Sequence, residues 1–237
     1  MRIAVLVVSV AFSLLVNVIP RPAGALTAAG RSEDISNLAD SKIVAGLKQA
    51  LRLSTAKAVA LTGRRDGFLK NDAIKIPLPT KLEPIGRGLR MLGMGQKVDE
   101  LEIGMNRAAE QSTPLAKQIF LAALKKMTFD DARHILTGGD TAATEYFKRA
   151  SSADLTIAFS PIVHQSMQQV GVVQQYERLI KAAPGGSTLA GEFDLDKYVV
   201  GKTLDGLFYM LGEEEKKIRK NPAAQTTTLL KEVFGKL

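Results

Sequence analysis

The stretch MNRAAEQSTP, from Met105 to Pro114, decides much of the fold because it combines a buried helix face with three polar side chains. The spacing of apolar residues around it predicts a helix over Gln96–Ser112. The buried stripe of this helix consists of Val98, Leu101, Met105, Ala108, Ala109 and Ser112. Asn106 and Glu110 flank the stripe one turn apart, and Arg107 precedes Glu110 by three residues. Polar groups beside a buried face need partners elsewhere in the fold.

A second helix, predicted over about 195–220, has a charged residue where an apolar one is expected. Its buried face is marked by Leu204, Leu207, Phe208, Leu211 and Ile218. Glu214 lies three residues after Leu211 and four before Ile218, so its side chain is expected to point inward. A carboxylate in that position must be paired or protonated, because burying it bare costs several kcal/mol.

These two helices predict a candidate site in which Asn106, Arg107 or Glu110 meets Glu214. In the interpretation that we favour, the meeting is a buried structural network that sets how the helices pack. A second interpretation leaves Glu214 half-exposed, next to two ordinary surface ion pairs of its own helix, Glu213–Lys217 and Glu215–Arg219. A third makes the carboxylates part of a ligand-binding or catalytic site.

The rest of the chain also reads as helix after helix. The expected helices are Ser41–Leu61, Thr80–Leu92, Gln96–Ser112, Thr113–Met127, one from Thr128, one from Asp140, Ser152–Val170, Val172–Ala182, about 195–220, and Asn221–Phe234. Thr113 is expected to cap its helix, with Pro114 in the first turn, and Thr128 with Asp131 forms a capping box. Residues 183–192 are expected to form a loop.

One stretch cannot be helical. IKIPLP, from Ile74 to Pro79, contains two prolines that hold it extended and remove two backbone donors. The fold class predicted is therefore all-α: a multi-helix, bundle-like single domain with one short extended segment near 74–79.

The N-terminus has the features of a secretory signal peptide. Arg2 precedes an apolar run from Ile3 to Ile19, and small residues follow at Ala23–Ala25. We expect residues 1–25 to be the signal peptide, 26–40 a linker and 41–237 the helical domain, with a periplasmic or secreted location. The alternative is that the apolar run stays uncleaved as a membrane anchor. After signal cleavage, no later run is long enough for a stable transmembrane segment.

Composition narrows the possible functions. An apolar fraction of 46% and a charged fraction of 24% exclude disorder over most of the 237 residues. The formal net charge of +8 suits anionic lipid, cell-wall polymer or acidic ligands. Nucleic acid is not expected as a partner, because the charge is scattered and only 5% of residues are aromatic.

Motifs of catalysis and metal binding are weak. Neither His134 nor His164 has a second His at ligand spacing, and the chain has no Cys, so each is read as a helix-surface residue. No nucleophile elbow or phosphate loop is present. We expect no metal and no cofactor.

Several long motifs carry a family resemblance. These are IKIPLP, MNRAAEQ, MTFDDARHILTGGDTAATEYF, FSPIV, FDLDKYV and LDGLFYMLGEEEKKIRKNPAAQTTTLLKEVFG. In order over about 40–236, they resemble an uncharacterised bacterial family of exported proteins, the domain of unknown function 4197. The resemblance implies a mostly helical periplasmic or secreted domain, and it implies no activity and no catalytic residues.

The function expected from the sequence is that of a non-enzymatic binding or structural module of the cell envelope. Its partner is unknown; an apolar or amphiphilic ligand, a lipid or another envelope protein are the candidates. The alternative is a hydrolase or lyase that uses the buried carboxylates Glu214 and Glu110 as acid and base. The candidate ligand-binding residues are Asn106, Arg107, Glu110 and Glu214.

Overall fold

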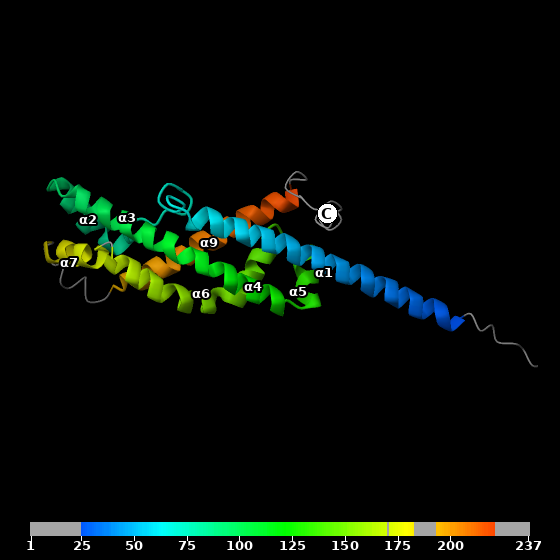
Figure 1. Ribbon diagram of the computed structural model, residues 1–237. Coiled ribbons are helices and arrows are strands. Elements are labelled where there is room, and N and C mark those ends of the chain that lie inside the picture. Colours follow the sequence, from blue (N-terminus) through cyan, green and yellow to red (C-terminus); the bar gives the residue numbers. More distant parts are fainter. Residues whose placement is uncertain (1–24, 170, 183–192, 221–237) are drawn as a thin grey trace, which may run out of the picture. The chain divides into compact units, whose positions relative to one another are not determined.

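The protein is all-α, as the sequence predicts. The computed structural model describes residues 25–169, 171–182 and 193–220 (Figure 1). Its α-helices are α1 (Ala25–Gly63), α2 (Glu83–Met91), α3 (Gly95–Ser112), α4 (Ala116–Lys126), α5 (Phe129–Thr137), α6 (Ala142–Gln169), α7 (Val172–Ala182) and α9 (Leu195–Lys220). Short 3₁₀ turns, Thr80–Leu82 and Thr113–Leu115, precede α2 and α4. No strand occurs in the described ranges.

The chain divides into two compact units, Met1–Asp40 and Ser41–Leu237. In the first unit the described residues, from Ala25 to Asp40, are helical and form the first part of α1. The segment expected to be a linker is thus helical: it contains a single glycine and no proline, and its alanines and leucines favour helix. The predicted signal peptide, the loop at 183–192 and the helix from Asn221 to Phe234 lie outside the described residues.

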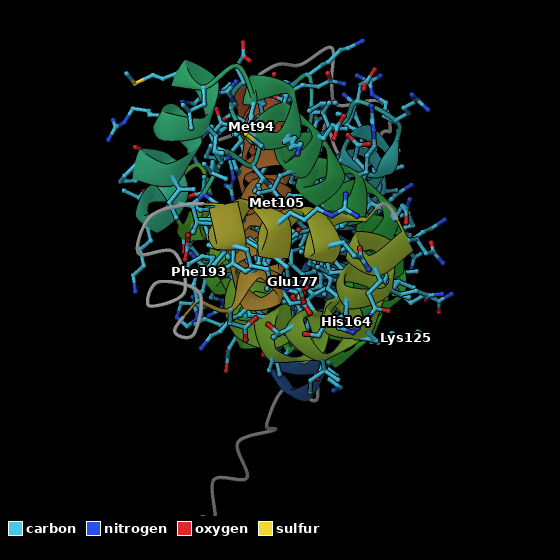
Figure 2. The ribbon with its side chains drawn as sticks, turned by 90° about the vertical axis from the view of Figure 1, so that its left-hand side faces the viewer. Met94, Met105, Lys125, His164, Glu177 and Phe193 are labelled. Carbon is cyan, nitrogen blue, oxygen red and sulfur yellow. The ribbon has the colours of Figure 1, made fainter. Side chains whose placement is uncertain are left out.

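The core of the second unit lies between α3, α4, α6 and α9. Phe147 of α6 packs edge-on against Phe120 of α4, with ring centroids 5.1 Å apart, and Phe208 of α9 is 6.0 Å from Phe120. Met105 of α3 is fully buried among these helices, whereas Lys125 and His164 lie at the periphery (Figure 2). The residues expected on the inner face of α3 are all buried.

Helix α6 is longer than expected. The sequence suggested one helix from Asp140 and another from Ser152, but α6 runs unbroken through both. Ser151 and Ser152 do not break it, because their hydroxyls donate to the carbonyls of Phe147 and Lys148 in the preceding turn. Pro161 lies inside the same helix on an exposed position.

Of the two residues predicted to cap helices, Thr128 does so and Thr113 does not. Thr128 caps α5 with the expected capping box: it accepts from the backbone N–H of Asp131, whose carboxylate accepts from the N–H of Thr128. Thr113 is not a cap. Its hydroxyl donates to the carbonyl of Ala109, at 2.8 Å, so the chain passes from α3 through a 3₁₀ turn into α4.

None of the helices in the described ranges is both long enough and apolar enough to cross a bilayer.

The contact between α9 and the segment after α1 generates a stability prediction. A Cβ on Gly206 would lie 2.6 Å from the ring edge of Phe68, which is fully buried. We expect Gly206→Ala to lower the free energy of unfolding by about 1–3 kcal/mol, because the overpacked ring must shift. Urea denaturation measures this change. The matched control is Gly201→Ala in the same helix, where nothing lies within 4 Å; it should stabilise by about 0.5–1 kcal/mol. Stabilisation by both substitutions would contradict the proposed close packing.

Candidate functional site

Asn106 holds the extended segment against α3. Its side-chain amide accepts from the N–H of Ile76 at 2.9 Å and donates to the carbonyl of the same residue at 2.8 Å. One turn earlier, Glu102 accepts a longer bond, 3.4 Å, from the N–H of Leu78. Because Pro77 and Pro79 have no N–H, the donors on either side of Pro77 are those of Ile76 and Leu78, and α3 side chains accept from both. The fully buried Asn106 therefore stands in for a neighbouring strand.

Glu110 holds the chain where it leaves α1. One carboxylate oxygen accepts from the backbone N–H groups of Phe68 and Leu69, at 3.1 and 3.2 Å. The other oxygen accepts from Arg107 at 2.6 Å, and the second arm of that guanidinium donates to Asp66, also at 2.6 Å. Glu110 is buried, and the guanidinium of Arg107 is the cation that balances its carboxylate.

The turn held by Glu110 is tight. Asp66 has a φ of 65°, in the left-handed region. A Cβ on the following residue, Gly67, would lie 2.4 Å from the carbonyl oxygen of Leu61. Only glycine permits this close return over the end of α1. The ion pair with Arg107, together with Lys70, keeps the pKa of Asp66 below its ordinary value.

Glu102, Asn106 and Glu110 are spaced by four residues, so they form one row along α3. Together they bond to the backbone of the segment from Phe68 to Leu78, which has few helical bonds of its own. This row explains why a helix with a buried face also carries Asn106, Arg107 and Glu110: the polar groups bind a non-helical stretch of the same chain.

Glu214 points inward as predicted, with a relative exposure of 2%. Its predicted meeting with the 106–110 region is wrong. Glu214 pairs with Lys57 of α1 and Lys217 of α9, each at 2.8 Å. Arg107 instead pairs with Asp66 and Glu110, and the cations beside Glu214 are Lys57 and Lys217. Burial raises the pKa of Glu214, but the hydrogen bonds from Lys217 and Lys57 outweigh it and lower that pKa overall.

Glu215 is the residue whose role the sequence did not reveal. Its carboxylate accepts from the backbone N–H groups of Ala143 and Thr144, at 2.9 and 2.8 Å, and from the Thr144 hydroxyl at 2.8 Å. It therefore occupies the N-terminus of α6, where free N–H groups and the helix dipole favour an anion. Glu215 thus supplies the acceptor for two of the first backbone N–H groups of α6.

Arg219 completes this junction. It pairs with Glu215 as predicted, but the pair is not on the surface: the two side chains are only 9% and 5% exposed. The same guanidinium donates to the carbonyl of Ile135 near the end of α5, at 2.7 Å. One turn of α9 thus binds both the end of α5 and the start of α6.

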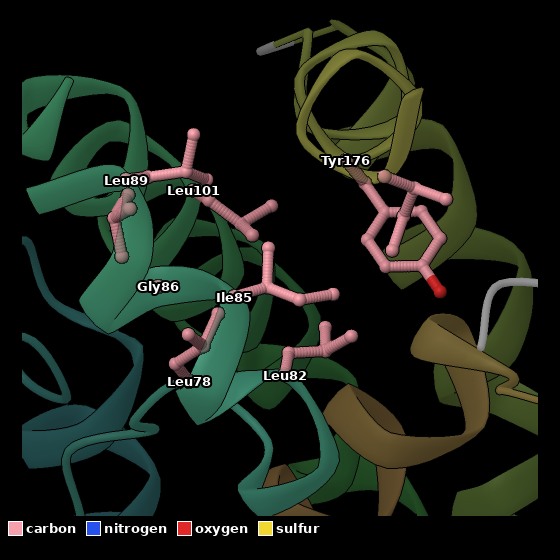
Figure 3. A pocket seen from close by; sticks show the side chains of 9 residues that line it. Leu78, Leu82, Ile85, Gly86, Leu89, Leu101 and Tyr176 are labelled. Carbon is pink, nitrogen blue, oxygen red and sulfur yellow. The ribbon is translucent and has the colours of Figure 1, made fainter. Parts of the chain in front are cut away.

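Four hollows lie among the residues that the structure describes, and one of them borders the Asp66 turn. The first is a narrow apolar slot where Tyr176 of α7 faces Leu82 and Ile85 (Figure 3), with a volume of about 10 Å³ that holds at most one water. Larger open hollows lie at the turn around Asp66, about 670 Å³, and beside His134, about 300 Å³. The fourth, about 410 Å³, is a groove between α1 and α4.

The candidate residues do not share one site. Asn106, Arg107 and Glu110 act together on the segment after α1, and Glu214 bonds to different partners. None of the four lines any of the hollows. In the part of the chain that the structure describes, no group of acidic or histidine side chains is arranged to hold a metal ion.

The two histidines lie apart from these clusters. His164 is exposed and bonds to Asp196 at 2.5 Å and to Gln168 at 2.7 Å. His134 lies on the exposed face of α5, in the last turn.

The fold and its buried carboxylate clusters define a helical protein whose inward-facing acidic side chains bond to its own backbone and cations. A family model described as protein of unknown function (DUF4197) matches residues 37–235, and the chain belongs to this family. This confirms the resemblance carried by the sequence motifs. No curated protein and no solved structure matches the chain.

The three consecutive glutamates of α9 provide an internally controlled mutagenesis test. Glu215→Gln should lower the free energy of unfolding by about 2–4 kcal/mol, because it removes a buried charge that several donors share. Glu214→Gln should have a smaller effect, since both of its lysines are more than half exposed and can turn to water. Glu213→Gln should change the urea midpoint least, because its side chain is 35% exposed and that of its partner Lys216 is 42% exposed, so water screens the pair. Equal effects at all three positions would contradict the assigned contacts.

Glu214 also predicts a pH dependence. A carboxylate whose pKa is lowered by folding contributes stability above its unfolded pKa, near 4.3, and this contribution is lost as the pH falls through the folded pKa. The difference in unfolding free energy between the wild type and Glu214→Gln should therefore narrow as the pH drops below about 4.3. Urea titrations at a series of pH values measure it. Glu213→Gln serves as the control, and a constant difference for Glu214→Gln would exclude the proposed linkage.

Proposed function

We propose that the protein is an exported, non-catalytic helical module of the cell envelope that works by binding. The observation that carries this proposal is the state of its buried polar groups. Glu110, Glu214 and Glu215 each accept bonds from backbone N–H groups or cations of the fold itself. Groups that are engaged in this way stabilise the fold and are not free to act on a substrate.

The alternative of a hydrolase or lyase that uses Glu214 and Glu110 lacks such support. An acid–base pair must reach the same substrate within hydrogen-bond distance. Glu110 bonds to Phe68, Leu69 and Arg107, whereas Glu214 bonds to Lys57 and Lys217, so the two carboxylates share no partner. Neither carboxylate lines one of the four hollows.

Export is supported by the N-terminal sequence. Arg2, the apolar run that follows it and the small residues before Leu26 fit a cleavable signal peptide. A positive chain outside the cytoplasm meets anionic lipid and cell-wall polymer, and both are partners for a binding module.

Cell fractionation and native mass spectrometry test the proposal together. We expect the chain in the periplasmic or extracellular fraction, with a mass that corresponds to cleavage after Ala25. We also expect native spectra of the chain from the envelope to show a bound amphiphile or a second protein. A cytoplasmic chain of full mass would refute export. A chain that is found only as a ligand-free monomer, with no gain on exposure to lipid extract, would refute the binding role.

A further inference from the structure

Charge is unevenly distributed over the helices of the second unit. Neither α1 from Ser41 to Gly63 nor residues 113–127, which include α4, contains a single Asp or Glu. Their basic residues are Lys42, Lys48, Arg52, Lys57, Lys117, Lys125 and Lys126. Helix α3, by contrast, carries four acidic and two basic residues. These two stretches therefore present cations to the solvent with no acidic residue of the same stretch beside them.

The groove of about 410 Å³ lies between the acid-free part of α1, Ser41 to Gly63, and α4. Its charged members are Arg52 on α1 and Lys117 and Lys125 on α4. All three are exposed, and none forms an ion pair with any residue that the structure describes. Two other cations of this region are already engaged: Lys57 by Glu214, and Lys48 by the carbonyl of Met127.

The rest of the groove lining is mostly apolar. Its uncharged residues are Ala56, Leu121 and Ala122, together with Thr55 and Gln118. The hydroxyl of Thr55 donates to the carbonyl of Leu51 at 2.6 Å. Two large apolar side chains close to groove residues in the sequence are exposed: Leu53 is 44% exposed and Leu115 is 40% exposed. Leu53 follows Arg52 and lies three residues before Ala56, and Leu115, at the end of the 3₁₀ turn, lies two before Lys117.

We propose that the α1–α4 groove binds the headgroup of an anionic phospholipid at a membrane surface. The cations of Arg52, Lys117 and Lys125 bind the phosphate, while the apolar lining and the two leucines contact the start of the acyl chains. The volume suits a small amphiphilic ligand. This inference rests on the proposed function and gives its ligand a chemical class.

Vesicle flotation of the full chain tests the inference. We expect binding to phosphatidylcholine vesicles that contain phosphatidylglycerol, weaker binding to phosphatidylcholine alone, and loss of the difference at high salt. The triple variant Arg52→Gln, Lys117→Gln, Lys125→Gln should bind the anionic vesicles roughly 100-fold more weakly, because each cation near such a surface contributes about fivefold. Any contribution of the apolar N-terminal residues is common to all variants and to both kinds of vesicle.

The matched control removes the same charges elsewhere. Lys81, Arg87 and Lys97 are exposed and form no ion pair within the described ranges, so Lys81→Gln, Arg87→Gln, Lys97→Gln leaves the same net charge as the groove triple. It should retain most of the binding. A second variant, Ala122→Glu, adds a carboxylate to an exposed position in the groove and should also abolish the preference for anionic vesicles. Circular dichroism verifies that each variant is folded.

Several outcomes would overturn the inference. Equal losses in the two triple variants would mean that net charge, not the groove, directs binding. Equal binding to neutral and anionic vesicles would exclude headgroup recognition. Full competition by soluble glycerol phosphate would show a site for free anions and not for a membrane surface. In each case the chain can still be exported and bind a protein, which fractionation and native mass spectrometry detect separately.

Discussion

The interaction on which the structure most depends is the bond between a buried helix side chain and the backbone of a segment that cannot satisfy its own donors. The stretch after α1 contains a left-handed residue and two prolines, so it cannot continue as helix. Glu110 and Asn106 accept its N–H groups inside the fold. Without these acceptors, buried donors would lose water and gain nothing in return.

Glu215 solves the same problem at the other end of the core. It binds the first N–H groups of α6, and Arg219 beside it binds a carbonyl of α5. Both clusters place a charge where backbone dipoles stabilise it. Glu110 and Glu214, the two carboxylates expected in the catalytic alternative, bond to backbone and cations of the fold itself. On the outside of the molecule, by contrast, Arg52 of α1 and Lys117 and Lys125 of α4 form no ion pair with any described residue.

Much of the fold was predictable because it depends on local patterns. The helical period marked the inner face of α3 correctly, and Thr128 with Asp131 announced the start of α5. The inward direction of Glu214 followed from its spacing to Leu211 and Ile218. Prediction from local sequence was wrong where a hydroxyl side chain could bond in two ways. Thr113 was expected to cap the next helix, but its hydroxyl donates to Ala109 in the preceding turn. A new helix was expected at Ser152, but Ser151 and Ser152 donate to the preceding turn and α6 continues through them.

The sequence alone determined the helical class, the family, the extended IKIPLP segment and the need of Asn106, Glu110 and Glu214 for partners. These properties depend on residue type and on spacings of a few positions. Only the tertiary structure decided which partners they receive. Lys57 reaches Glu214 across 157 positions of sequence, and Glu215 reaches Ala143 across 72. Such pairings depend on how the helices pack in space, because a buried charge accepts any donor that packing brings within reach.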